Sequence, residues 1–363
     1  MKHQALTFLF SIALLGLPPA AVAAGSSDCA DAVEQEAFGT ALQLCKPLAQ
    51  QGDAVGQYNL GWMYLRGRGV TRDTAEAIKW IRRAAGQEFA PAQSTMGAMY
   101  YAGQGVPQQF IEAAKWFRLA AEQGLAEAQY NLAILYANGH GVSRDNAEAV
   151  QWSRRAAEQG HADAQYQLGY SYRKGRGVEP DDSQAAKWYR AAGEQGHAVA
   201  QNALGVMYEN GFGVAEDDAE AVKWYRRAAE QNFAPAQKNL GVMYANGEGV
   251  AEDDAEAVRW YRMAAQQGFR DAQLNLGAMY YAGRGVPQDY AQAVRWFRRA
   301  AEKELAAAQF NLGVMYADGT GVAQDDAEAA RWYARAAMRG HTDARRQLEA
   351  LRERQKAGLE SEN

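Results

Sequence analysis

Ser171 and Lys174 have the Ser-x-x-Lys spacing of enzymes in which a lysine assists a serine nucleophile. Those enzymes also carry Ser-Asp-Asn and Lys-Thr-Gly segments, and this sequence contains neither. Ser171 also falls near the end of a predicted helix, where the helix dipole opposes developing negative charge. Gly-x-Ser-x-Gly and His-Glu-x-x-His segments are absent from the sequence as well. We therefore predict that the protein is not an enzyme.

The histidines do not have the spacing of a metal site. His161, His197 and His341 occupy the same position of a 36-residue repeat. Equivalent atoms of neighbouring packed helices lie roughly 10 Å apart, whereas metal–ligand bonds are about 2 Å long. Carboxylate pairs such as Asp217-Asp218 precede predicted helices, where negative charge is favourable. We therefore expect no metal and no cofactor.

The repeat that sets these positions runs from residue 53 to residue 340 without an insertion. Eight tryptophans are spaced 36 residues apart, and we expect them to form the core. Tandem repetition is typical of α-solenoids, in which each helix pair buries its apolar face against the next pair. The tryptophans are at positions 80, 116, 152, 188, 224, 260, 296 and 332, and the repeats span 53–88, 89–124, 125–160, 161–196, 197–232, 233–268, 269–304 and 305–340.

Each repeat predicts two helices joined by a turn that contains glycine. In the first repeat, Leu60, Gly61 and Tyr64 share one helix face. A glycine inside a helix costs about 1 kcal/mol relative to alanine, so we expect the recurring Gly61 at a close helix–helix contact. After the turn, Asp73 and Glu76 have the spacing of a capping box at the start of the second helix.

The segments Ala-x-Ala-Gln-x-x-Leu-Gly-x-Met-Tyr, Gly-x-Gly-Val, Asp-x-x-Glu-Ala and Trp-x-Arg-x-Ala-Ala-Glu-Gln-Gly resemble those of the Sel-one-like repeat (SLR) family, relatives of tetratricopeptide repeats. The resemblance covers about four fifths of the chain. It implies an all-α fold, a right-handed α-solenoid of stacked antiparallel helix pairs whose first helices line a concave groove. It also implies a scaffold or adaptor that binds a protein or peptide. A cysteine-rich branch of the family has been linked to β-lactams, which leaves β-lactam binding or hydrolysis as a minor alternative.

A second stripe of the first helices predicts the binding face of this groove. At 100° per residue, Tyr58 and Trp62 lie about a third of a turn from the Leu60 stripe, and such residues are enriched at interaction hot spots. An adjacent amide row resembles the ligand-holding asparagine of tetratricopeptide domains. Alternatively, these amides bond to the backbone of the neighbouring helix pair. The candidate aromatic residues are Tyr58, Trp62, Tyr101, Tyr130, Tyr166, Tyr170, Tyr281 and Phe310, and the amide row is Asn59, Asn131, Gln167, Asn239, Asn275 and Asn311.

The first 23 residues have the features of a secretory signal peptide. An apolar run over 5–17 precedes the small-x-small segment 21–23, and 13 residues are too few to span a bilayer as a helix. We therefore expect an exported protein without an integral membrane span, in the periplasm or secreted into the medium. In an exported protein, Cys29 and Cys45 predict a disulfide. Lipidation at Cys29 is the alternative, but the residues before it lack the Leu-small-small context.

The flanking segments 24–52 and 341–363 predict an N-terminal cap with a degenerate repeat and a C-terminal capping helix with a tail.

The sequence has 38 Lys+Arg and 43 Asp+Glu, a formal net charge of −5. A nucleic-acid-binding protein needs a basic face to neutralise phosphates, so we expect no nucleic-acid partner.

Overall fold

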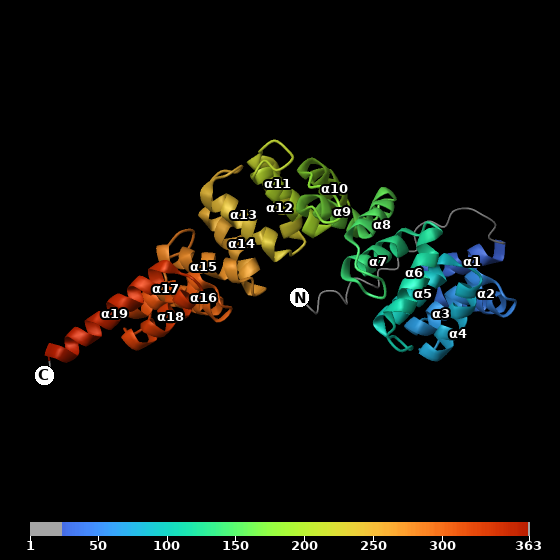
Figure 1. Ribbon diagram of the computed structural model, residues 1–363, viewed down its shortest axis with the longest axis horizontal. Coiled ribbons are helices and arrows are strands. Elements are labelled where there is room, and N and C mark those ends of the chain that lie inside the picture. Colours follow the sequence, from blue (N-terminus) through green and yellow to red (C-terminus); the bar gives the residue numbers. More distant parts are fainter. Residues whose placement is uncertain (1–23, 362–363) are drawn as a thin grey trace. The chain divides into compact units, whose positions relative to one another are not determined.

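The computed structural model describes residues 24–361, which form 19 α-helices and contain no strand. Consecutive helices pair along the chain (Figure 1), and this confirms the predicted all-α fold of stacked helix pairs. The helices are α1 (Ala24–Glu34), α2 (Phe38–Gln50), α3 (Ala54–Arg66), α4 (Thr74–Gly86), α5 (Ala90–Ala102), α6 (Phe110–Glu122), α7 (Ala126–Asn138), α8 (Asn146–Glu158), α9 (Ala162–Lys174), α10 (Asp182–Glu194), α11 (Ala198–Glu209), α12 (Asp218–Glu230), α13 (Ala234–Asn246), α14 (Asp254–Gln266), α15 (Arg270–Ala282), α16 (Tyr290–Glu302), α17 (Ala306–Asp318), α18 (Asp326–Met338) and α19 (Thr342–Ser361).

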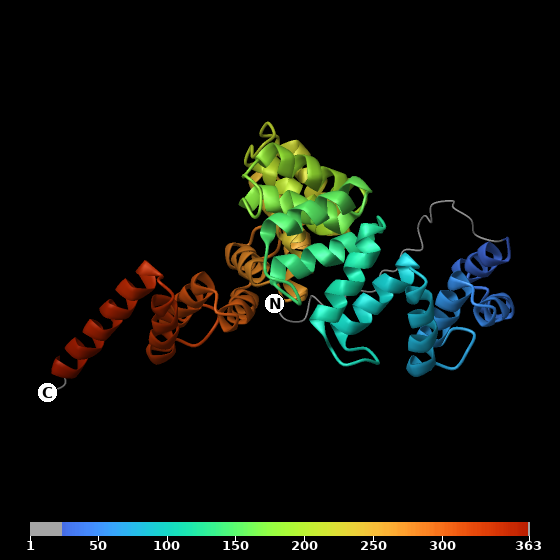
Figure 2. The ribbon, with the colours of Figure 1, turned by 45° about the vertical axis from the view of Figure 1, so that its right-hand side comes forward.

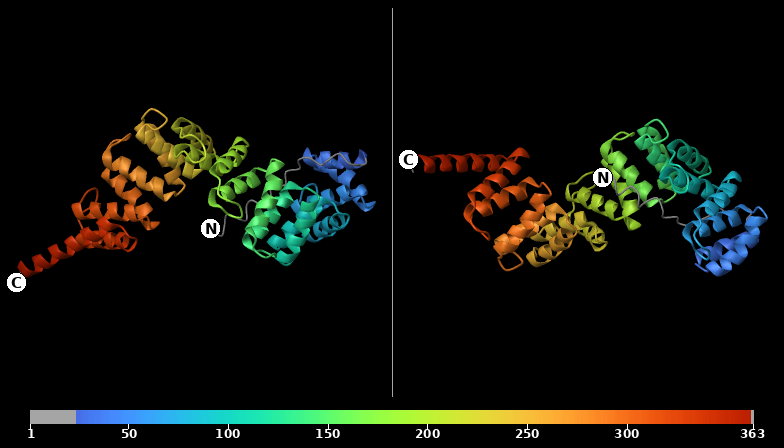
Figure 3. Two further views of the ribbon diagram at one scale, coloured as in Figure 1. Left: turned by 45° about the horizontal axis from the view of Figure 1, so that its top comes forward. Right: turned by 90° about the horizontal axis from the view of Figure 1, so that it is seen from below.

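The described chain divides into two compact halves, which we call the N-terminal half (24–181) and the C-terminal half (182–361). Within each half, every helix packs on the next one along the chain, as the further views in Figures 2 and 3 show. In the N-terminal half α1 packs on both α2 and α3, and in the C-terminal half the long α19 packs on α18. The predicted signal peptide, residues 1–23, lies outside the described residues.

The turns and caps of the repeat follow from backbone chemistry. Gly67 ends α3 with a φ of 66°, in the left-handed region that favours glycine. The carboxylate of Asp73 accepts hydrogen bonds from the backbone N–H groups of Ala75 and Glu76 at 2.9 and 3.0 Å, and so caps α4. Glu76, which we expected to complete a capping box, instead accepts a hydrogen bond from Lys79 at 2.5 Å.

A ring packed on a glycine forms the centre of most repeats. A Cβ atom added to Gly241 would lie 2.7 Å from the ring of Tyr261, so only glycine lets α13 and α14 approach this closely. Gly313 and Tyr333 make the same contact between α17 and α18. The predicted close approach at this glycine is therefore present.

In seven of the eight repeats, a large core side chain is the residue after the periodic tryptophan. Of the eight tryptophans, Trp152, Trp224 and Trp260 are buried and the other five are half-buried. The prediction that all eight form the core therefore holds only in part. Trp116, Trp296 and Trp332 pack against the core from its edge, and arginines such as Arg335, 4.5 Å from the ring of Trp332, lie over the ring. The buried residues at the following position are Ile81, Phe117, Ser153, Tyr189, Tyr225, Tyr261, Phe297 and Tyr333.

Buried glutamines connect each helix pair to the one before it. The side-chain amide of Gln129 donates to the backbone oxygen of Ala121 at 3.1 Å, and the amide of Gln159 donates to the Gln129 oxygen at 2.8 Å. Gln237 and Gln267 repeat this arrangement in the C-terminal half. The amides of Gln129 and Gln237 are therefore paired through both nitrogen and oxygen, as is usual for buried polar groups.

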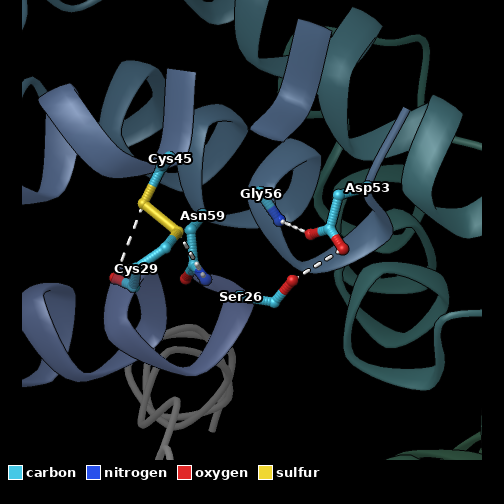
Figure 4. Close-up of a disulfide and its surroundings, with 6 residues drawn as sticks. All are labelled: Ser26, Cys29, Cys45, Asp53, Gly56 and Asn59. Carbon is cyan, nitrogen blue, oxygen red and sulfur yellow. Dashed lines mark hydrogen bonds between the residues drawn. A yellow bond between two sulfur atoms is a disulfide. The ribbon is translucent and has the colours of Figure 1, made fainter. Parts of the chain in front are cut away.

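A disulfide joins α1 to α2 in the N-terminal cap (Figure 4). Its cysteines, Cys29 and Cys45, have Cα atoms 5.1 Å apart. Beside it, the Ser26 hydroxyl donates to the Asp53 carboxylate at 2.8 Å, and the same carboxylate caps α3 by accepting the Gly56 N–H at 2.7 Å. These contacts attach α1 to the first repeat as well as to α2.

Candidate functional site

Five aromatic residues of the predicted groove face lie half-buried on the first helices of the N-terminal half, and we call them the aromatic stripe. Partial burial leaves part of each ring open to a partner while neighbouring side chains hold it. The members of the aromatic stripe are Trp62, Tyr101, Tyr130, Tyr166 and Tyr170.

The middle of the stripe is held by histidines from neighbouring repeats. The ring of Tyr101 lies 5.3 Å from that of Phe110, which in turn stacks on His140 at 4.7 Å. Tyr130 packs on His161 at 4.8 Å, and His161 Nε2 lies 2.9 Å from the Glu127 carboxylate. These contacts fix the orientation of both tyrosine rings.

The two ends of the stripe are supported in a similar way. At one end, Trp62 of α3 stacks on Phe38 of α2 with ring centroids 6.3 Å apart. At the other end, Tyr166 and Tyr170 of α9 lie 6.5 Å apart, and the Arg176 guanidinium lies 5.2 Å above the Tyr170 ring. The stripe therefore consists of rings that the fold has already oriented.

Three tyrosine hydroxyls of the stripe are affected by burial. It raises the pKa of the Tyr101, Tyr130 and Tyr166 hydroxyls, and for Tyr130 the nearby carboxylates of Asp163 and Glu127 raise it further. These hydroxyls therefore remain protonated at neutral pH and can donate hydrogen bonds to a ligand.

Three of the predicted contact residues are buried, and the expectation that they face a partner is wrong. Tyr58 is only 4% exposed because its ring packs against Phe89 at 5.4 Å and its hydroxyl bonds to Thr95. Asn59 and Asn131 are 3% and 5% exposed. For Asn59 the physical reason is α1, which packs over α3.

The amide row bonds mainly to other side chains. Asn59 lies 3.7 Å from the Cys29 sulfur (Figure 4), and Asn131 donates to Glu127 of its own helix at 3.2 Å. In the C-terminal half, Asn239 donates to Asn202 of the preceding pair at 3.0 Å, and Asn275 bonds to the Tyr261 hydroxyl. These four amides therefore do not form a free ligand-binding row, and within the described part of the chain they do not bond to the backbone of the neighbouring helix pair.

The C-terminal half has a thinner aromatic face. Tyr281 is 42% exposed and packs on Tyr290 at 5.3 Å, the same pair of positions as Tyr101 and Phe110. Phe310 of α17 stacks on His341 at 4.5 Å, and the last predicted amide, Asn311, is half-buried beside it. The corresponding positions of α11 and α13 are Asn202, Val206, Lys238 and Val242.

Sequence analysis did not assign the second rings that hold the stripe. Phe110 and Tyr290 occupy a position at which four other repeats have aspartate, and His140 lies in a turn. A comparison of the repeats with one another indicates this pairing. The two repeats with an aromatic residue at this position also have a tyrosine, Tyr101 or Tyr281, at the end of their first helix.

The histidines at helix starts act as caps. Nδ1 of His161, His197 and His341 accepts the backbone N–H three residues later at 3.1 to 3.3 Å. Over residues 24–361 there is no group of three or more His, Cys, Asp or Glu side chains that could hold a metal ion. In the same range, no helix has the length and apolar character needed to cross a bilayer.

Comparison with known proteins identifies the repeat. The Sel1 repeat family model matches eight segments, 54–88, 90–125, 126–161, 162–197, 198–233, 234–269, 270–305 and 306–341. A sel1-like repeat-containing protein of Acanthamoeba polyphaga mimivirus is 48% identical over 42 residues, which is 12% of this chain and 7% of the viral protein.

Two solved structures are similar over most of the chain. One is a protective antigen present in uropathogenic Escherichia coli strains that displays an SLR fold, with 36% identity, a TM-score of 0.67, and coverage of 86% of this chain and 74% of that one. The other is a Sel1 repeat protein from Oxalobacter formigenes, with 32% identity, a TM-score of 0.65, and coverage of 93% and 98%. Sel1 repeat proteins are generally scaffolds that mediate protein interactions. The chain, with eight matching repeats and this paired-helix fold, belongs to the Sel1 repeat family.

Proposed function

We propose that this protein is a non-catalytic scaffold that binds a protein or peptide partner through the aromatic stripe of its N-terminal half. The observation that carries the proposal is the set of half-buried rings on successive first helices, each held by a second ring or by a guanidinium. Rings that are already oriented lose little conformational entropy when a partner covers them. The general role of the family in protein interactions supports the same conclusion.

The stripe suits an extended or helical peptide with apolar side chains and backbone groups near its surface. Tyrosine rings supply apolar area, and their protonated hydroxyls supply hydrogen-bond donors. The formal net charge of −5 does not favour a nucleic-acid partner.

The test starts with a pull-down from periplasmic extract, followed by calorimetry with the captured partner. Trp62→Ala and Tyr166→Ala should each weaken binding by about 2 kcal/mol, the loss typical of a central aromatic contact. Tyr281→Ala, an exposed aromatic of the C-terminal half, is the matched control and should bind like the wild type. Undiminished affinity in both N-terminal variants would move the binding site away from the stripe.

We also propose that the protein is exported, either to the periplasm or to the medium. The apolar run and small-x-small segment of residues 1–23 support export, and so does the cysteine pair of the N-terminal cap. One similar solved structure is that of a protective antigen, and this agrees with the proposal of export. Intact mass and cell fractionation test this: a chain in the cytoplasm that retains residues 1–23 would contradict export.

A further inference from the structure

The junction of α7, α8 and α9 in the N-terminal half contains a pocket of about 320 Å³. Its volume is at the small end of the range for ligand sites. Two serines replace large side chains there. Ser153 takes the position that is Ile, Phe or Tyr in the other seven repeats, and Ser171 takes the position that is Met or Leu in the others. The missing ring and the missing thioether leave the pocket open.

The polar lining of the pocket is basic. Arg144 and Arg176 line it together with Asn146 and Gln167, and it contains no carboxylate. Within residues 24–361, neither guanidinium forms an ion pair, and the side chains of Asn146 and Gln167 make no hydrogen bond to the protein. Asp145, the acidic neighbour of Arg144, uses its carboxylate to cap α8.

Ser153 and Ser171 extend this set of unused polar groups. They are 2% and 6% exposed. Neither hydroxyl bonds to another side chain within the described residues, and both line the pocket, so both are available to a molecule inside it. With Asn138, seven polar side chains therefore line a space that the protein itself does not fill, and the apolar part of the lining includes Ala133 and Ala149.

The equivalent junction three repeats later is closed. There Arg284 takes the place of Arg176 and donates to Asp254 at 2.7 and 3.0 Å and to Glu252 at 3.2 Å. Its remaining contact is the backbone oxygen of Ala245 at 2.8 Å. Tyr261, at the position of Ser153, is 4% exposed.

Comparison of the two junctions shows which groups have changed. The residues equivalent to Glu252 and Asp254 are Arg144 and Asn146, so the two acids that neutralise the arginine have been replaced by a second arginine and an amide. The junction of α7, α8 and α9 also lacks a core ring, because Ser153 stands at the position of Tyr261. Two solvent-exposed arginines without an acid beside them in the lining therefore stand beside an emptied core position, an arrangement in which an anionic ligand can pair with the guanidinium groups and occupy the space below them.

We propose that this pocket binds a small organic anion whose carboxylate or phosphate group pairs with Arg144 and Arg176. The amides and serine hydroxyls hold the polar body of the molecule, and the alanine side chains contact its apolar part. This small-molecule site shares Arg176 with the aromatic stripe, where the guanidinium lies above the Tyr170 ring. Its test uses variants of residues outside the stripe, so the result can be judged whether or not the scaffold proposal holds.

The test is calorimetry of the purified protein at low ionic strength with four probes: inorganic phosphate, citrate, glucose 6-phosphate and uncharged glucose. We expect citrate or glucose 6-phosphate to bind and glucose not to bind. If inorganic phosphate bound as tightly as citrate and glucose 6-phosphate, the pocket would not recognise the organic part of the ligand, and the proposal of an organic anion would be overturned. Binding of glucose, or no binding by any anion, would overturn the proposal.

Two variants copy the closed junction. Arg144→Glu/Asn146→Asp restores the acids found beside Arg284, and Ala133→Gly/Ser153→Tyr restores the glycine and ring of Gly241 and Tyr261. Each should weaken anion binding at least tenfold while the circular dichroism spectrum stays unchanged. Arg284→Ala, which removes an arginine already paired with acids, is the control and should bind like the wild type. Equal binding in both pocket variants would place the anion elsewhere.

Discussion

The N-terminal and C-terminal halves are built from the same repeat, and they differ in how completely the repeat is filled. In the C-terminal half, Tyr261 occupies the centre of its repeat and Asn275 bonds to its hydroxyl. In the N-terminal half, Ser153 leaves a pocket at the same position, next to Ala133 in place of the usual glycine. The large side chain and the glycine are both absent from this repeat, and in the other repeats the glycine makes room for a large side chain such as Ile81 or Tyr261.

The buried glutamines differ in the other direction, because two of those in the C-terminal half have an oxygen without a hydrogen-bond partner in the described chain. In the N-terminal half the oxygens of Gln57, Gln93 and Gln129 each accept a hydrogen bond from a second glutamine. In the C-terminal half the Oε1 atoms of Gln273 and Gln309 lack a partner within the described residues. Their second glutamines are replaced by Lys303 and Arg339, which bond elsewhere. The difference is confined to these two glutamines, because Gln201 and Gln237 of the same half are paired as in the N-terminal half.

The largest expected effect comes from opening the filled junction. Tyr261→Ser should destabilise the C-terminal half by about 3–5 kcal/mol, because it empties core volume and leaves the Asn275 amide without its partner. Urea unfolding followed by circular dichroism measures this. Tyr281→Ser, at an exposed ring, is the control and should change stability by less than about 0.5 kcal/mol. A loss as small as that of the control would mean that the ring does not carry the core of its repeat.

The N-terminal cap provides the next test. Cys29→Ala/Cys45→Ala should destabilise the cap by about 3 kcal/mol, since the crosslink no longer limits the unfolded chain. Because each repeat contacts only its neighbours, faster hydrogen exchange should appear in α1, α2 and α3 and leave α13 to α18 unchanged. Uniformly faster exchange throughout both halves would contradict this local view of stability. Free thiols in the isolated wild-type protein would show that the bond does not form.

The smallest effect concerns the unpaired glutamines. Lys303→Gln should stabilise the protein by about 1 kcal/mol, because a glutamine at this position donates to the oxygen of Gln273 as Gln267 does to Gln237. The midpoint of urea unfolding should rise at constant slope. Lys303→Ala is the matched control, since it removes the lysine without supplying a donor. Equal stability of the two variants would show that the amide pair contributes nothing.

Much of the fold could be predicted from the sequence because the repeat encodes it locally. Gly67, Asp73 and the glycine at Gly61 act through backbone geometry and through contacts with the adjacent helix, so their spacing alone indicates helix, turn and cap. The 36-residue period alone could not show which of two consecutive large residues fills the core, and for this reason the tryptophans were assigned to it. Trp80 and Ile81 are both apolar and adjacent, and only the packing shows that Ile81 is buried while Arg83 covers Trp80.

The candidate site was predicted less well, because exposure depends on what covers a helix face. Tyr58 and Asn59 have the spacing of the groove face, but α5 and α1 bury them. The aromatic positions Tyr101, Tyr130 and Tyr166 are half-buried. The ring beside Tyr101 comes from the second helix of its own repeat, and the ring beside Tyr130 comes from the next repeat. Helical periodicity places residues on a face, and it contains no information about the second layer of side chains.

The sequence by itself determined the all-α class, the length and number of the repeats and the positions of their turns, because these depend on interactions within about 36 residues. Only the tertiary structure decided which large side chain fills each repeat, which groove residues remain open and where a pocket lies. Those properties depend on pairs such as Ser153 with Ser171 or Arg284 with Asp254, which come from different helices. Substitutions in two adjacent repeats act on one volume, and their joint effect exists only once the helices are packed.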